Sequence, residues 1–147
     1  MKTRVLFAAL ALAAASLTAC SSETVSHDAT TLPENARNLI SKNFSAAISL
    51  VETEKSMGTT HEYEVTLADG SEITFGGNGE WKSVETPSNR AVPSGLVPTA
   101  IAKYVAERHA GASVIGIEKN KKGYEVELSN GLEMQFDAAG NFLQYDK

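Results

Sequence analysis

The sequence predicts an α+β fold of two tandem units, each a helix followed by four antiparallel strands, with both helices packed on one face of the sheet. Residues 63–75 form two alternating segments around Asp-Gly, and residues 124–136 repeat them around Asn-Gly. Such a pattern is the strongest short-range hairpin signal, and its recurrence in the same register indicates a duplicated unit. An apolar helical face with a proline precedes each copy.

The first twenty residues are typical of a secretory signal peptide. Lys2 and Arg4 precede an apolar run at 5–15 that is too short to span a bilayer as a helix. The segment ends Leu17-Thr18-Ala19-Cys20, which resembles a bacterial lipobox and implies cleavage before Cys20 and lipidation of its sulfur. The alternative is an ordinary signal-peptidase site beside Cys20. Because no other cysteine exists, an internal disulfide is excluded.

The mature chain is acidic, and its first residues are polar. Removing residues 1–20 lowers Lys+Arg from 13 to 11 against 18 Asp+Glu, so the formal charge changes from −5 to −7. This balance argues against nucleic acid as a partner, because nucleic-acid binding needs a basic footprint. Residues 21–31 are mostly polar and predict a flexible tether between the anchor and the fold. The expected contact with the membrane is then made by the lipid anchor on Cys20.

Two helices are predicted from apolar spacing and from proline. Pro33 and Pro98 suit a helix start, where a missing N–H costs nothing. One apolar face follows at helical spacing in each copy, formed by Leu32, Ala36, Leu39, Ile40 and Phe44 in the first and by Val97, Ile101, Tyr104, Val105 and His109 in the second.

Four strands are predicted after each helix. Extended segments at 48–55 and 112–119 both end in Glu-Lys, and the hairpins at 63–75 and 124–136 alternate with a period of two. That period indicates one buried and one exposed face. The last strands begin at Trp81 and Phe142, which we expect in the core.

The predicted organisation is a first unit at 32–85, a linker at 86–96 rich in Pro, Ser and Gly, and a second unit at 97–147. A unit of this size buries a marginal core alone. We therefore expect the two units to pack together in one continuous sheet with both helices on one side.

These motifs resemble a known family. A lipobox, a Leu-Pro or Val-Pro helix, the pattern Tyr-Glu-Val-x-Leu-x-Asp/Asn-Gly-x-Glu-x-x-Phe and a following Gly-x-Trp/Phe look like the PepSY-like, or β-lactamase-inhibitor-like, lipoproteins of Bacteroidetes-type envelopes. The resemblance covers residues 32–85 and 97–147. It implies a sheet with a flanking helix that binds proteins or peptides. Its motifs are structural rather than chemical, and from the residues themselves we predict no catalytic residues and no cofactor.

The sequence shows no reactive constellation. His27, His61 and His109 lack the spacing that would place two metal ligands on one helix face, so we predict no metal site. His27 and His61 are expected to be exposed, and His109 to lie in the core or at its rim. The stretch at 137–141 lacks the alternating oxygen ligands of a calcium loop and predicts a turn.

The strand glutamates are the candidate binding face. They alternate with apolar residues in both hairpins and comprise Glu62, Glu64, Glu72, Glu125, Glu127 and Glu133. One interpretation is a surface for a basic peptide or partner protein. The other is a solvated sheet face whose charges guard against aggregation.

The sequence therefore favours a non-catalytic, lipid-anchored binding module of the bacterial envelope with an unknown protein or peptide ligand. Ser21 after Cys20 resembles the outer-membrane sorting preference, with the domain facing the periplasm or the cell surface. The alternative is an inhibitor or regulator of a secreted protease or other hydrolase. A third class, an enzyme, would need a deep pocket that gathers titratable residues with perturbed pKa values.

Overall fold

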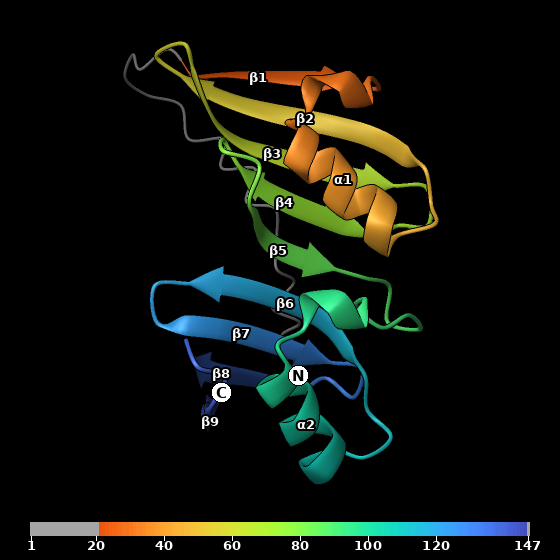
Figure 1. Cartoon of the computed structure of the whole chain (residues 1–147), viewed down its shortest axis with the longest axis vertical. Helices are drawn as coiled ribbons and strands as arrows, with labels where there is room; N and C mark the ends of the chain where they lie inside the picture. The colour runs from red at the N-terminus through yellow and green to blue at the C-terminus, as the bar shows by residue number, and fades with distance from the viewer. Residues whose placement is uncertain (1–20, 147) are drawn as a thin grey trace, which may run out of the picture.

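The computed structural model describes residues 21–146 as one nine-stranded antiparallel sheet with two α-helices. Each strand pairs with the next one along the chain, so the sheet runs from β1 to β9 without a crossover (Figure 1). The α+β class is confirmed. The strands are β1 (Ser21–Ser26), β2 (Ile48–Ser56), β3 (Thr59–Leu67), β4 (Glu72–Gly76), β5 (Trp81–Glu85), β6 (Val114–Asn120), β7 (Gly123–Leu128), β8 (Glu133–Asp137) and β9 (Phe142–Tyr145).

Both helices cover the same face of the sheet (Figure 1). Helix α1 (Glu34–Asn43) precedes β2, and α2 (Thr99–Arg108) precedes β6. Two short 3₁₀ turns, Ala29–Thr31 and Ser94–Leu96, lead into them. Pro33 and Pro98 occupy the N-cap positions, one residue before the first helical residue. No helix within residues 21–146 is long and apolar enough to cross a membrane.

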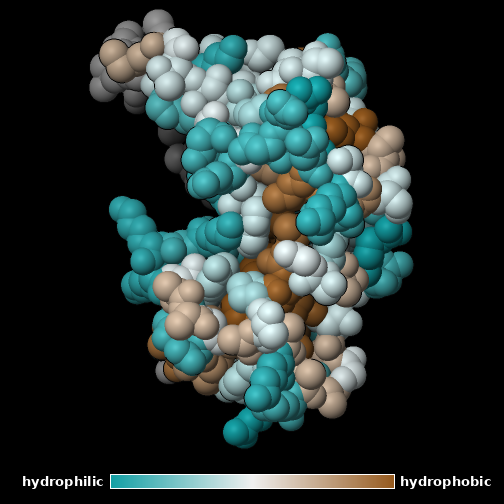
Figure 2. Space-filling view, in the orientation of Figure 1, coloured by the Kyte–Doolittle hydropathy of each residue, from teal (hydrophilic) through white to brown (hydrophobic). Residues whose placement is uncertain are grey.

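The core lies between the helices and the inner face of the sheet. Ala36 and Ile40 of α1 are buried, as are Ile101 and Val105 of α2. From the sheet, Phe75 and Phe136 are the largest fully buried side chains. The predicted apolar faces of both helices are therefore the ones that pack, and in Figure 2 apolar side chains gather at the centre of this side, between the two helical parts.

Strands β5 and β6 join the two halves into one sheet. Val84 of β5 pairs with Ile117 of β6, and both side chains are buried. The neighbouring pairs are Ser83 with Glu118 and Glu85 with Gly116. The expectation of one continuous sheet is confirmed, because the backbone ladder crosses the boundary between the halves.

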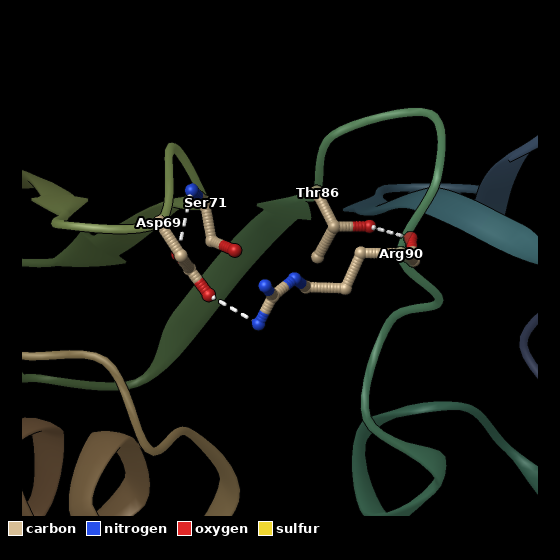
Figure 3. A network of polar contacts seen from close by, with 4 residues as sticks. All are labelled: Asp69, Ser71, Thr86 and Arg90. Carbon is tan, nitrogen blue, oxygen red and sulfur yellow. Dashed lines mark hydrogen bonds and ion pairs between the residues drawn. The ribbon is translucent and has the colours of Figure 1, made fainter.

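The stretch predicted as a linker, residues 86–96, is attached to the sheet by hydrogen bonds and by an ion pair. The Thr86 hydroxyl donates to the carbonyl oxygens of Arg90 and Ile115, at 2.6 and 3.1 Å. Val92 is buried, and its N–H donates to the Val114 carbonyl at 2.8 Å. Figure 3 shows the Arg90 guanidinium reaching Asp69 in the turn between β3 and β4. Hydrogen bonds and one ion pair therefore fix this connection.

Strand β1 corrects the prediction of a flexible tether at residues 21–31. Ser21–Ser26 pairs antiparallel with β2, and Ala29–Thr31 forms the first 3₁₀ turn. The polar composition misled the prediction, because an edge strand needs only backbone hydrogen bonds from its neighbour and no buried side chains. Cys20 and the signal segment lie outside the described residues.

Candidate binding face

The face of the sheet opposite the helices carries the predicted glutamates, and we call it the open face. Successive side chains of a strand point to opposite faces, and the residues that alternate with these glutamates are buried on the helix side. Val65 separates Glu64 from Thr66, and Val126 separates Glu125 from Glu127. The six predicted residues, Glu62, Glu64, Glu72, Glu125, Glu127 and Glu133, all lie on this face in register.

A hollow of about 390 Å³ lies in the open face over β2 to β6. Three of the predicted glutamates line it, namely Glu62, Glu64 and Glu72. Four more that the prediction did not include line it as well, namely Glu52, Glu54, Glu85 and Glu118. The only base in the lining is Lys82, which pairs with Glu62. Seven carboxylates thus face one ammonium group.

Glu85 is the most perturbed carboxyl of the hollow. It lies across from Glu72 on β4 and from Gly116 on β6. Burial, followed by repulsion from Glu72, Glu127, Glu118 and Glu64, raises its pKa to about 7. Burial and neighbouring carboxylates also raise the pKa of Glu64. Ionising all the carboxyl groups of the hollow therefore costs free energy, because the carboxylates repel one another. A cation placed there would reduce this repulsion.

A second acidic group lies at the far end of the open face. Glu125, Glu133 and Asp146 each place a carboxylate oxygen within 4.8 Å of the others. Burial, followed by the charges of Asp146, Glu118 and Glu133, raises the pKa of Glu125, and burial, followed by Glu133, raises that of Glu127. The Gln135 amide nitrogen donates to both Asp146 oxygens at 3.2 Å. Of the six predicted glutamates, three line the hollow and two, Glu125 and Glu133, belong to this group. Glu127 lies across from Gly116 and Glu133 and is in neither set.

The residues missed in the prediction had a detectable signal. Glu52 and Glu54 alternate with Val51 and Thr53 on β2, and Glu118 follows Ile117 on β6. Extending the period of two from the hairpins to these strands would have included them. Glu85 was placed at the end of the first unit, where nothing local shows that β6 lies beside it.

The remaining residues singled out in the sequence are the three histidines and the aromatic residues Trp81 and Phe142. His27 and His61 are exposed, and His27 Nδ1 lies 2.8 Å from the Ser49 carbonyl oxygen. His109 is half-buried at the end of α2, with its Nε2 3.3 Å from the Tyr145 hydroxyl, which agrees with a rim position. Trp81 and Phe142 pack against the core while remaining partly exposed.

The stretch at 137–141 is a turn, as expected. Its Asp137 carboxylate accepts hydrogen bonds from the backbone N–H groups of Ala139 and Asn141 and from the Asn141 side chain. These bonds satisfy the carboxylate within the turn and hold its pKa below the usual range. The acidic residue therefore shapes the connection between β8 and β9.

The sheet, the two helices on one face and an acidic open face define the chain as an α+β protein of the PepSY-like type. The family model described as putative beta-lactamase-inhibitor-like, PepSY-like matches residues 61–144, more than half of the sequence. The chain belongs to this family. No protein of curated function matches it.

Three solved structures of the same fold come from Bacteroides species. One, described as a putative periplasmic protein of unknown function from Bacteroides vulgatus, is 41% identical, with a TM-score of 0.79 over 86% of this chain and 100% of that one. Another, described as a putative calcium-regulated periplasmic protein from Bacteroides thetaiotaomicron, is 32% identical, with a TM-score of 0.77 over 85% and 97%. A third, a putative periplasmic protein from Bacteroides vulgatus, is also 32% identical, with a TM-score of 0.76 over 85% and 97%. All three relatives are described as putative periplasmic proteins, and the first as a protein of unknown function.

Proposed function

We propose that the protein is a non-catalytic binding module of the bacterial envelope that holds a basic segment of a protein or peptide against its open face. The hollow of about 390 Å³, with seven glutamates and one lysine, carries the proposal. Sites for small apolar ligands are lined mainly by hydrophobic and aromatic side chains. This hollow is lined mainly by charged and polar residues, with two apolar residues, Val65 and Ile73, and no aromatic ring. Its charge is matched instead by the Lys or Arg side chains of an extended segment.

Enzyme chemistry is the competing interpretation, because the hollow gathers titratable groups with raised pKa values. A pair of carboxylates can act as general acid and base in glycoside hydrolysis. The lining, however, offers no aromatic platform for a sugar and no histidine or cysteine. Its raised pKa values follow from burial and mutual repulsion among many carboxyls, which a bound cation relieves. Binding therefore accounts for the site better than catalysis.

Calcium is a poor fit to the second acidic group. Ca²⁺ takes six to eight oxygen ligands, a number that Glu125, Glu133 and Asp146 reach only if all three carboxylates bind through both oxygens. The Gln135 amide also directs its N–H donors, rather than its oxygen, at Asp146. These three carboxylates are therefore not proposed as a calcium site, although one relative is described as calcium-regulated.

The binding test uses photocrosslinking and charge variants. A photoreactive residue at Thr74, which lines the hollow, should capture a protein through a Lys- or Arg-rich segment in intact cells. The triple variant Glu64→Gln, Glu72→Gln, Glu85→Gln should abolish capture, while neutralising the exposed Glu34, Glu80 and Glu107 outside the hollow should not. Equal capture by both triple variants, or no captured protein, would sink the proposal.

A direct binding measurement accompanies the crosslinking. An alternating Arg-Thr decapeptide should bind the full chain in detergent at least tenfold more tightly than its Glu-Thr counterpart, with an affinity that falls as salt rises. Addition of calcium chloride to the protein should leave its amide NMR spectrum unchanged, because the second acidic group is a poor fit to Ca²⁺. If a captured partner is a hydrolase whose rate falls on binding, the module acts as an inhibitor, the role that the family description suggests.

We also propose that Cys20 carries the lipid anchor and that Ser21 directs the protein to the outer membrane. The lipobox-like segment ends one residue before β1 begins. An anchor at this point would hold the edge of the sheet close to the membrane surface. Cys20→Ser should move the protein from the membrane fraction to the periplasmic fraction, and an unchanged distribution would contradict the anchor.

We further infer that α1 with β2–β5 and α2 with β6–β9 are two copies of one unit. The support is the sequence repeat together with matching registers. Ile73 pairs with Val84 as Met134 pairs with Tyr145, and Phe75 pairs with Trp81 as Phe136 pairs with Phe142. In this correspondence β9 is the counterpart of β5.

A further inference from the structure

Strand β9 is one of the two edges of the sheet in the described part of the chain, where its only strand partner is β8. The Asp146 N–H donates to the Glu133 carbonyl at 2.9 Å, toward β8. Because backbone groups alternate in direction along an antiparallel strand, the N–H and C=O of Tyr145 point away from β8. This edge therefore presents unpaired backbone groups that can extend the ladder.

The counterpart edge within the same molecule is already occupied. Strand β5 has the same irregularity against β4, between Thr74 and Phe75, that β9 has against β8, between Gln135 and Phe136. Despite this bulge and its short length, β5 accepts β6 through three residue pairs. Short length and bulges commonly protect an edge. Here they do not prevent pairing, so they do not exclude a partner strand at β9.

Side chains at the β9 edge are more exposed than their counterparts in β5. Val84, whose strand has β6 beside it, is fully buried, whereas Tyr145, which corresponds to it, is 46% exposed, and Leu143, two residues earlier, is 52% exposed. Tyr145 is held in place by Phe142, with ring centroids 4.8 Å apart, and by His109. A positioned aromatic ring is a suitable anchor for a partner's apolar side chain.

Charge decides which kind of strand fits. On the open face beside β9, the carboxylates of Glu125, Glu133 and Asp146 lie within 4.8 Å of one another. A second copy pairing through β9 would bring its Asp146, the residue after that strand, next to this group, and one pairing through β1 would bring its Glu23 there. Like charges opposite one another destabilise strand pairing, whereas Lys or Arg at that position would offset the crowding. Self-pairing is therefore disfavoured.

We propose that the free edge of β9 takes an extended segment of another protein as a tenth, antiparallel strand, with an apolar residue beside Tyr145 and basic residues beside Gln144 and Asp146. The pairing of β6 with β5 supplies the template, so this step rests on the inferred duplication. It concerns an edge separate from the hollow of the proposed function. Backbone hydrogen bonds provide affinity in this mode, and alternate side chains provide specificity.

The test uses a peptide built on β6. The probe carries residues 114–120 with Gly116→Lys and Glu118→Lys, which places lysines on the open face and Ile117 beside Tyr145. Added to the full chain in detergent, it should shift the amide resonances of Phe142–Tyr145 and slow hydrogen exchange of the Tyr145 N–H. The peptide with the native Gly116 and Glu118 should bind at least tenfold more weakly.

N-methylated probes separate strand addition from simple charge attraction. The Thr86 N–H donates to Ile115 across the β5–β6 ladder, so by alternation the Ile117 nitrogen also faces β5 and that of residue 118 faces away. Methylation at residue 117 should weaken binding at least tenfold, and methylation at residue 118 should not. Equal effects of the two methyl groups, or no binding of the unmethylated probe, would overturn the proposal.

Two protein variants distinguish this edge from the hollow. Asp146→Asn should weaken binding of the probe, whereas Glu72→Gln with Glu85→Gln should leave it unchanged. Resonance shifts confined to the hollow would overturn the edge proposal while supporting the binding face. Dimerisation of the chain through β9 would overturn it in favour of a second copy as the occupant.

Discussion

Arg90 Nη1 lies 2.8 Å from Asp69 Oδ2 and ties the connection between the halves to the turn between β3 and β4 (Figure 3). Asp69 also accepts the Ser71 N–H at 3.0 Å. That hydrogen bond, with a further contribution from Arg90, holds the pKa of Asp69 below its usual range. One carboxylate thus organises a turn and anchors the linker.

Arg90→Ala should lower the free energy of unfolding by about 0.5–1 kcal/mol, because a partly exposed ion pair contributes little more. The difference from the parent should disappear as the pH falls through the pKa of Asp69, since a lowered carboxyl pKa contributes stability only while the group is ionised. Urea denaturation at several pH values measures this effect. Lys103→Ala, which removes an exposed pair with Glu107 at 3.8 Å, is the control and should have a smaller effect.

Glu85 should make the protein less stable as the pH rises. Its folded-state pKa of about 7 exceeds the ordinary value of 4.5, so the unfolded chain gives up this proton first. The free energy of unfolding therefore falls between those two values and is level above them. After allowance for solvent screening of a half-buried group, Glu85→Gln should raise stability at pH 8 by about 1–2 kcal/mol.

The measurement is the urea midpoint from pH 4 to 8 for the parent and Glu85→Gln. The variant's curve should be flatter, and high salt should flatten the parent's curve too, because part of the shift is repulsion between carboxylates. Glu107→Gln, an exposed change on α2, should follow the parent. A parent whose stability rises steadily with pH would contradict the crowding inferred for the hollow.

Val84 should contribute to the stability of both halves. It is fully buried and pairs with Ile117 across the β5–β6 seam. Val84→Ala should cost about 2 kcal/mol, whereas Val25→Ala, the same substitution at a side chain that is 56% exposed, should cost under about 0.5 kcal/mol. Denaturation of the parent should follow one transition by fluorescence and circular dichroism. Two separate transitions would show that the halves unfold independently.

Local patterns were sufficient to predict the helices and hairpins. The apolar face from Leu32 to Ile40 and the turns at Gly70 and Gly131 depend on residues close together in the sequence. Strand β1 was not predicted, because Ser22, Glu23 and Thr24 carry no hydrophobic signal and pair only through the backbone of β2. A strand of this kind is determined by its neighbour rather than by its own composition.

The candidate site was predicted in part for a similar reason. Alternation in the hairpins identified Glu64 and Glu72, but their assembly with Glu118 in one hollow depends on the pairing of β5 with β6. That contact joins residues about thirty positions apart, and no local pattern encodes it. The pKa of Glu85 is raised by burial and by carboxylates on both sides of this pairing, first Glu72 on β4 and then Glu127 and Glu118 in the second half. The contribution from the second half could not be expected before the halves were placed together.

Gly123 should be far less tolerant of substitution than Gly131, although both have positive φ, 145° and 81°. A Cβ on Gly123 would overlap the Phe136 carbonyl oxygen and the Asp137 backbone, which cannot move without breaking the β7–β8 pairing. A Cβ on Gly131 would meet nothing within 4 Å, so only the backbone conformation resists it. Gly123→Ala should therefore cost about 3 kcal/mol and Gly131→Ala about 1 kcal/mol in the free energy of unfolding. Thermal and urea denaturation of the two variants measure the difference, and equal losses would show that the close approach of β8 to Gly123 does not restrict this position.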